Sequence, residues 1–136
     1  MFCYCAESRR VARLLTARYD AALAGSGLSA SQFEVLDNLA GLEGASGRAL
    51  AEQLAVDKTT LSRNLKALIT AGLVRVQADG DDARQAMYTL TAKGRVRLAK
   101  TKPLWQRAHD ATVQMLQAKS SATQKSLLGM SAALRA

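Results

Sequence analysis

The sequence predicts a mainly α-helical protein that carries one two-stranded β-hairpin. Only one of its 136 residues is proline, which favours long helices. Apolar residues recur at the three- and four-residue spacing of amphipathic helices in several segments. Directly after Gly72 this period changes to the alternation of apolar and polar residues that is typical of strands.

Length and charge limit the class of protein further. A chain of this length suits one compact domain with helical extensions. Nineteen Lys and Arg against eleven Asp and Glu give a net charge of +8, which predicts an acidic partner such as nucleic acid or an anionic surface. Residues 48–91 hold six basic and five acidic residues, whereas residues 92–136 hold nine basic and one acidic. The overall charge is therefore weak support for a nucleic-acid contact in the central segment.

The sequence predicts a cytoplasmic protein. No apolar run approaches the ~18 residues that span a bilayer, and the start, MFCYCAESRR, lacks the apolar core of a signal peptide. In that compartment Cys3 and Cys5 are expected to be free thiols rather than a structural disulfide.

Two helices are expected before the centre of the chain. The first spans residues 2–24 and has a broad apolar face, and residues 25–29 interrupt the helical pattern. The second begins at about Ser31, and a polar break follows at residues 41–47. The side chains expected to point inward from the second helix are Phe33, Val35, Leu36, Leu39 and Leu42.

The central segment, residues 48–72, predicts a short helix, a three-residue turn and a second helix. Asp57 is a suitable N-cap for the second helix, and Gly72 is placed to end it in the left-handed conformation. A cationic and hydroxyl-bearing face opposite an apolar stripe is how a helix-turn-helix presents a recognition helix to the major groove. The alternative is an ordinary amphipathic helix pair. The stripe consists of Leu61, Leu65, Leu68 and Ile69, and the opposite face of Thr59, Arg63, Lys66 and Thr70.

A β-hairpin and two further helices are expected to follow. The strands are residues 73–77 and 86–90, with residues 78–84 as a long tip. A helix-turn-helix followed by a hairpin is a winged helix-turn-helix. A long helix then runs from an N-cap at Thr91 to about Lys119 and bends at Pro103, and a capping box at residues 121–124 opens the last helix.

The terminal helices carry apolar stripes that a winged helix of residues 28–91 does not need. We therefore expect residues 1–27 and 92–136 to be dimerisation segments that pair with a second copy of the chain. A twofold dimer would place two recognition helices about one turn of DNA apart and bind an inverted repeat.

One motif gives the chain a family resemblance. Asp82-Ala83-Arg84 is followed after five residues by Leu90-Thr91 and then Gly94, directly behind the helix-turn-helix. With the segment 54–68 and the order of elements, this pattern makes the whole chain resemble the MarR family of bacterial transcriptional regulators. The resemblance implies a homodimer that binds double-stranded DNA and regulates transcription, and a repressor is the expected form. It also implies that a small molecule or an oxidant switches the protein.

The resemblance also implies which residues contact DNA. Base edges would be contacted by Thr59, Ser62 and Arg63, with Arg63 on a guanine, and phosphates by Lys58 and Lys66. Arg84 would enter the minor groove, oriented by Asp82. The alternative for these two residues is a hairpin tip that serves solubility. For the cations that open the long helix, contact with flanking phosphates and simple solvation both remain open.

The two cysteines have two interpretations. They are small core residues, or they sense oxidants, because the register is similar to that of the organic-hydroperoxide regulators of the family. That similarity implies Cys5 as the reactive cysteine and Tyr19 of the partner subunit as its hydrogen-bond partner, although Arg9 and Ala30 stand where two further tyrosines are expected. Oxidation of Cys5 to a sulfenic acid or disulfide would loosen DNA binding. A Cys3–Cys5 disulfide is disfavoured, because the two lie about 200° apart on a helix.

Other functions are less well supported by the sequence. Two cysteines and the distant His109 do not make a four-ligand zinc site, and no nucleophile motif or Gly-rich phosphate loop is present, so we expect no catalytic residue, metal or cofactor. A regulator switched by a small phenolic or anionic ligand and a weakly specific architectural DNA-binding protein are the alternatives.

Overall fold

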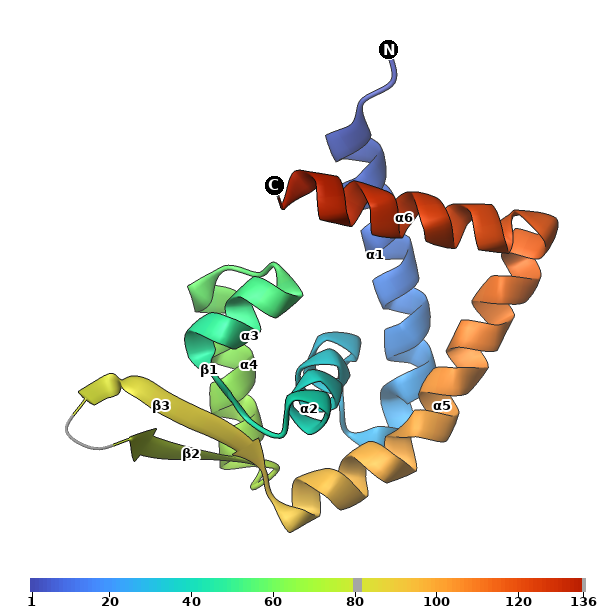
Figure 1. Cartoon of the computed structure of the whole chain (residues 1–136). Helices are drawn as coiled ribbons and strands as arrows, with labels where there is room; N and C mark the ends of the chain where they lie inside the picture. The colour runs from blue at the N-terminus through green and yellow to red at the C-terminus, as the bar shows by residue number, and fades with distance from the viewer. Residues whose placement is uncertain (80–81, 136) are drawn as a thin grey trace.

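The computed structural model describes residues 1–79 and 82–135, and the side chains of residues 79 and 82–85 lie outside the description. The order of helices and strands confirms a mainly helical winged helix-turn-helix with terminal helices at both ends (Figure 1). The helices are α1 (Tyr4–Leu23), α2 (Ala30–Leu42), α3 (Gly47–Leu54), α4 (Lys58–Thr70), α5 (Ala92–Leu116) and α6 (Ser120–Leu134), with 3-10 turns η1 (Ala24–Ser26) and η2 (Gln117–Lys119) and strands β1 (Ala45–Ser46), β2 (Val74–Asp79) and β3 (Asp82–Leu90).

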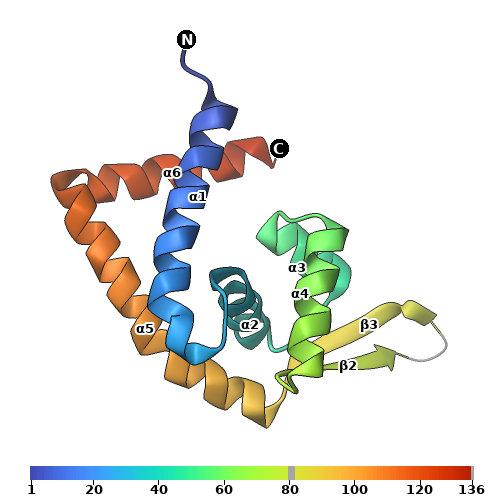
Figure 2. The same ribbon diagram turned by 180° about the vertical axis from the view of Figure 1, so that it is seen from behind.

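The core lies around α2, which sits between α1 and α4 in both views (Figures 1 and 2). Four of the five predicted inward positions of α2 are buried, but Leu42 is 46% exposed because it is the last residue before the chain turns at Glu43. α1 and α5 each contribute to the same cluster, through Leu23 and Leu98. The other members are Leu28, Phe33, Val35, Leu36, Leu39, Ala45, Leu50, Leu61, Leu65, Leu68, Leu73, Val74 and Leu90.

The sheet is larger than the predicted hairpin. Its strand order is β1-β3-β2, antiparallel throughout, and β1 pairs Ala45 with Tyr88. β1 lies within the break expected at residues 41–47, because two residues are too short to show a period. The hairpin tip is also shorter than predicted, since Asp79 pairs with Asp82 beyond an irregularity that follows Gln77.

The ends of the terminal helices differ from the prediction. α1 begins at Tyr4 rather than residue 2, with Cys3 as its N-cap. α5 ends at Leu116 because Gln117 takes a positive φ of 52°. The predicted capping box at residues 121–124 is wrong: α6 begins at Ser120 without a side-chain cap, and the Thr123 hydroxyl donates to the carbonyl of Lys119. The ribbon of α5, which contains Pro103, bends along its length as predicted (Figure 1).

A tight joint connects the end of α4 to the start of α5. The N–H groups of Gly72 and Leu73 close α4 by donating to the carbonyls of Ile69 and Leu68, with Gly72 at a φ of 76°. Thr91 caps α5 by accepting from Gly94 N at 2.9 Å, and its hydroxyl donates to the Gly72 carbonyl at 2.6 Å. The Thr91 and Gly94 of the sequence motif are therefore structural residues of this joint.

Gly94→Ala should destabilise the protein, because a Cβ on Gly94 would overlap the carbonyl oxygen of Leu73. We expect a loss of about 2–3 kcal/mol in the free energy of unfolding, as for other overpacked sites, measured by denaturant titration. Gly41→Ala is the matched control, because a Cβ at this position in α2 meets nothing within 4 Å. That change should stabilise by roughly 0.5–1 kcal/mol. Equal effects of the two substitutions would contradict the steric explanation.

Candidate nucleic-acid interface

α4 separates an apolar face from a polar one, as predicted. Leu61, Leu65 and Leu68 are buried in the core, and Ile69 is half-buried beside them. The structure brings five predicted DNA-contact residues together on the exposed side of this one helix. They are Lys58, Thr59, Ser62, Arg63 and Lys66.

The first turn of α4 is organised by Asp57. Its carboxylate accepts the backbone N–H of Thr60 at 2.8 Å and the Thr60 hydroxyl at 2.9 Å, which confirms the predicted N-cap. These hydrogen bonds from Thr60 hold the pKa of Asp57 below its ordinary value of 3.8. Thr60 is thereby engaged within the protein, whereas the neighbouring Thr59 side chain is exposed to solvent.

The turn before α4 is held by its backbone. Ala55 takes a φ of 52°, an uncommon conformation for a residue with a Cβ. The N–H of Val56 donates to the Ala51 carbonyl at 3.1 Å and so ties the turn back to α3. Residues 55–57 thus form the predicted three-residue turn of a helix-turn-helix.

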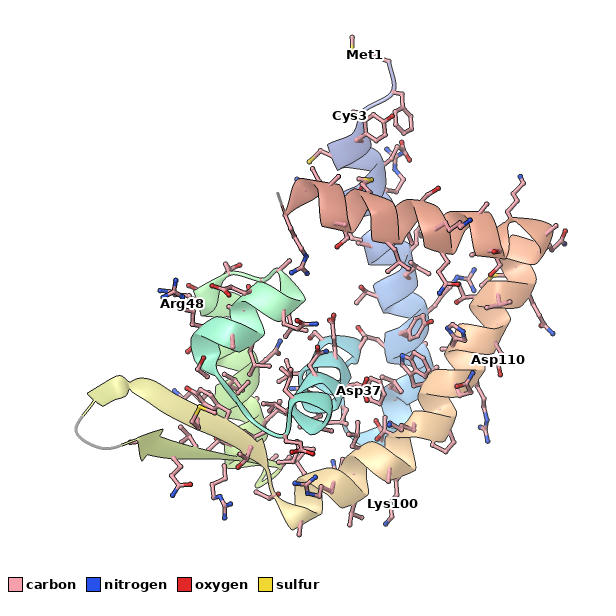
Figure 3. The ribbon with its side chains drawn as sticks, viewed as in Figure 1. Met1, Cys3, Asp37, Arg48, Lys100 and Asp110 are labelled. Atoms are coloured by element: carbon pink, nitrogen blue, oxygen red, sulfur yellow. The ribbon has the colours of Figure 1, made fainter. Side chains whose placement is uncertain are left out.

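A groove of about 680 Å³ runs beside the polar face of α4. Its floor includes Leu61, Leu65 and the Tyr88 ring of β3, and Lys58, Ser62 and Lys66 of α4 also line it. Arg48 lines its α3 side, and Figure 3 shows this side chain directed away from the body of the chain. Sequence reasoning missed Arg48 and Tyr88, because β1 and β3 bring these segments next to α4 only in the folded chain.

The wing residues cannot be placed in the same way. Asp82 and Arg84 belong to β3, but their side chains lie outside the described residues, and their predicted minor-groove role remains a prediction. The described parts of β2 and β3 extend away from the helices (Figures 1 and 2).

Three of the five cations that open α5 have partners within the chain. The Lys93 ammonium donates to the carbonyl of Ala71 at 3.0 Å, and the Arg97 guanidinium donates to that of Ser26 at 3.2 Å. Lys102 pairs with Asp37 at 3.6 Å. Arg95 and Lys100 are exposed, and Lys100 extends from the outer side of α5 (Figure 3). Protein contacts therefore account for much of this cationic run.

The two thiols lie at the free end of α1, far from Tyr19 of the same chain. Both cysteines are exposed in the single chain, so neither belongs to the core of its own chain. The backbone N–H of Ala6 donates to the Cys3 sulfur at 3.5 Å. Tyr19 lies fourteen positions after Cys5 on the same helix, a rise of about 21 Å. Since Cys3 precedes the helix, the 200° separation that disfavoured a Cys3–Cys5 disulfide does not apply.

Tyr19 instead lines a second cleft, of about 680 Å³, between α1, α2, α5 and α6. Trp105 of α5 is central to it, with ring centroids 5.9 Å from Phe33 and 5.2 Å from His109. The charged residues that line this cleft are Glu34 and Asp37, and burial raises the pKa of Glu34. The cleft therefore combines an aromatic wall with an acidic edge.

Within residues 1–79 and 82–135, no three His, Cys, Asp or Glu side chains come together as a metal site would require. Over the same part of the chain, no helix has both the length and the apolar character needed to cross a membrane.

Comparisons with known proteins identify similar structures over the whole chain. A family model described as MarR family matches residues 26–85. The M. tuberculosis transcriptional regulator MosR in complex with DNA is 36% identical, with a TM-score of 0.83 over 98% of this chain and 96% of that chain. A mutant of E. coli MarR complexed with operator DNA is 25% identical, with a TM-score of 0.78 over 90% and 88% of the two chains. No curated protein matches the chain significantly.

Asp57→Ala should weaken the start of α4, because it removes the acceptor for two hydrogen bonds from Thr60. A carboxyl whose pKa is lowered by folding stabilises the protein above its unfolded-state pKa, and that stabilisation is lost as pH falls through the folded-state pKa. The difference in unfolding free energy between wild type and Asp57→Ala should therefore be full at neutral pH and shrink below about pH 4.

Asp57→Asn is the control for charge, since an amide also caps a helix but does not titrate in this range. The difference between the Asn and Ala variants should not depend on pH. Chemical unfolding between neutral and acidic pH measures both differences, and a wild type–Ala difference that stays constant would contradict the assignment.

Proposed function

The chain belongs to the MarR family of transcriptional regulators, and on that premise we propose that it represses transcription by binding an inverted-repeat operator as a homodimer. The observation that carries the proposal is the exposed row of cations and hydroxyls on α4, held in place by the burial of the opposite face. Two similar structures, MosR and MarR, were crystallised with DNA, which supports DNA as the partner.

On α4 we assign base contacts to Thr59, Ser62 and Arg63. The guanidinium of Arg63 can bind O6 and N7 of a guanine together, whereas Lys58 and Lys66 act as point charges on phosphates. Arg48 on the far side of the groove adds a third phosphate contact in this proposal. The wing would add Arg84 in the minor groove, oriented by Asp82.

Dimerisation is supported by the apolar surface of the terminal helices. Within the described chain no residue of α6 is buried, and Leu23 is the buried residue of α1. Leu14 on α1 and Leu128 and Leu134 on α6 are 61%, 65% and 76% exposed. Because large exposed apolar side chains on one element are typical of interfaces, we assign residues 1–27 and 92–136 to contacts with a second copy.

We propose thiol oxidation as the signal that releases DNA. Both Cys3 and Cys5 are free and exposed, at the end of a helix assigned to the dimer interface. A hydroperoxide would oxidise the Cys5 thiolate to a sulfenic acid and be reduced to the alcohol. The change in size and polarity would then act on the packing between subunits.

A small-molecule effector in the cleft around Trp105 is the second candidate. The cleft joins helices of the winged domain to the terminal helices, so a ligand there would affect their relative positions. The charged residues that line the cleft, Glu34 and Asp37, are acidic, and Lys102 balances the charge of Asp37. This lining favours a neutral aromatic ligand over the anionic one that is an alternative from the sequence.

Arg63→Ala should weaken binding mainly at one base pair of the operator. We expect a loss of ~1–3 kcal/mol and relaxed specificity at that position, measured by anisotropy on duplexes with single substitutions. Lys66→Ala is the comparison variant. It should weaken binding to all duplex sequences by the same amount and lower the salt slope of binding by about 1. A uniform loss with Arg63→Ala would contradict its role, and the absence of any preferred site would favour architectural binding.

Oxidant should release wild-type protein from the gene's own upstream region but not Cys5→Ser. Anisotropy at fixed salt, before and after an organic hydroperoxide, makes the measurement, and Cys3→Ser tests the second thiol separately. Release of Cys5→Ser by the same oxidant would eliminate this cysteine as the sensor. If oxidant does not change DNA binding of the wild-type protein either, a small-molecule effector in the cleft around Trp105 would be favoured as the signal.

A further inference from the structure

We propose that Arg135 is a positioning residue for DNA binding, which holds the end of α3 and so sets the helix-turn-helix relative to the terminal helix α6. The inference rests on the proposed function and names a determinant of operator affinity that lies outside the DNA-contact surface. It starts from a contact between two segments more than 80 residues apart in the sequence.

The Arg135 side chain binds two neighbouring backbone carbonyls at once. The two terminal nitrogens of Arg135 donate to the carbonyl oxygens of Glu52, at 2.8 Å, and Gln53, at 3.0 Å. The C-terminal end of α6 points to the side of the molecule on which α3 lies in both views (Figures 1 and 2). A planar guanidinium is suited to two adjacent acceptors, and its orientation is thereby fixed.

The end of α3 benefits from an external cation. α3 has only eight residues and no basic residue in its last turn. Its last carbonyls carry the partial negative charge of a helix C-terminus. The backbone of Ala55 reaches the carbonyls of Ala51 and Glu52, and Arg135 adds a donor for Gln53.

A cation from another element also contacts the carbonyls at two other ends, those of α4 and η1. Lys93 donates to Ala71 after α4, and Arg97 donates to Ser26 at the end of η1. α4 and η1 also lack basic residues in their last turns. Cations from the C-terminal third thus supply the charge that these ends lack, which explains part of the basic excess of residues 92–136 without DNA.

Arg135 differs from these two cations in where it comes from. Lys93 and Arg97 lie on α5, which is joined directly to the winged domain, whereas Arg135 follows α6. Because α6 buries none of its described residues within the chain, its position depends on the second copy that we propose to cover it. Through the Arg135 contact, the position of α3 therefore depends on how the two subunits pack. Since α3 packs on the recognition helix α4, the position of α4 depends on the dimer as well.

The test compares Arg135→Ala with Lys125→Ala, which removes an exposed cation of α6, in the full-length protein. Operator affinity is measured by anisotropy at several salt concentrations. We expect Arg135→Ala to bind roughly 3- to 10-fold more weakly with an unchanged salt slope, and Lys125→Ala to match wild type. A phosphate contact would instead lower the slope by about 0.9. The operator affinity of Arg135→Lys should lie between those of wild type and Arg135→Ala, because an ammonium does not reproduce the two parallel hydrogen bonds of the guanidinium.

Two measurements without DNA complete the test. Amide hydrogen exchange should increase in residues 47–56 of Arg135→Ala, and sedimentation should give the same oligomeric state as wild type. Unchanged affinity, a reduced salt slope or dissociation of the Arg135→Ala oligomer would each overturn the inference. Failure of the wild-type protein to bind any operator would instead contradict the proposed function, and the positioning role with it, whereas the exchange data would still report on the contact.

Discussion

The joint between α4 and α5 is the constraint on which the rest of the structure depends. The Thr91 hydroxyl makes two hydrogen bonds. It donates to the carbonyl of Gly72 at the end of the recognition helix and accepts from the N–H of Gly94 in the first turn of α5. The carbonyl of Leu73 lies so close to Gly94 that no side chain fits there. Close packing of this kind leaves few arrangements open. The recognition helix is therefore oriented by the same short segment that starts the long helix.

Charge serves two purposes in this chain, and they occupy different places. On α4 the cations are exposed beside hydroxyls, with the opposite face buried, so they are available to a polyanion. On α5 and after α6, Lys93, Arg97 and Arg135 instead lie against backbone carbonyls at the ends of other elements. A cation at a helix C-terminus stabilises that end, and it also ties together the two elements involved. Net charge alone does not distinguish these uses.

The proposed regulation follows from which surfaces remain open. The apolar faces of α1 and α6 are exposed in the single chain, and the aromatic cleft around Trp105 lies between these helices, α2 and α5. A change at this cleft or at the thiols of α1 acts first on the terminal helices. Two of their links to the winged domain are the joint at Thr91 and the Arg135 contact. Either signal thus has a route of packed and hydrogen-bonded residues to α4.

The sequence by itself determined the local elements. The stripe of Leu61, Leu65 and Leu68, the cap at Asp57 and the turn at Gly72 depend on residues within one or two helical turns, so their spacing is sufficient to predict α4. The change of period after Gly72 predicted the hairpin of the winged arrangement in the same way. The resemblance added the contact that each residue of the DNA-contact face would make.

Only the tertiary structure decided the contacts between distant segments. β1 has no period of its own and exists because Ala45 meets Tyr88. The exposure of Cys3 depends on a helix start that its own sequence pattern placed two residues too early. The partners of Lys93 and Arg135 are carbonyls, which every residue carries, so no residue type in the sequence marks them. Their identity follows from the distances that folding creates between segments far apart in the chain.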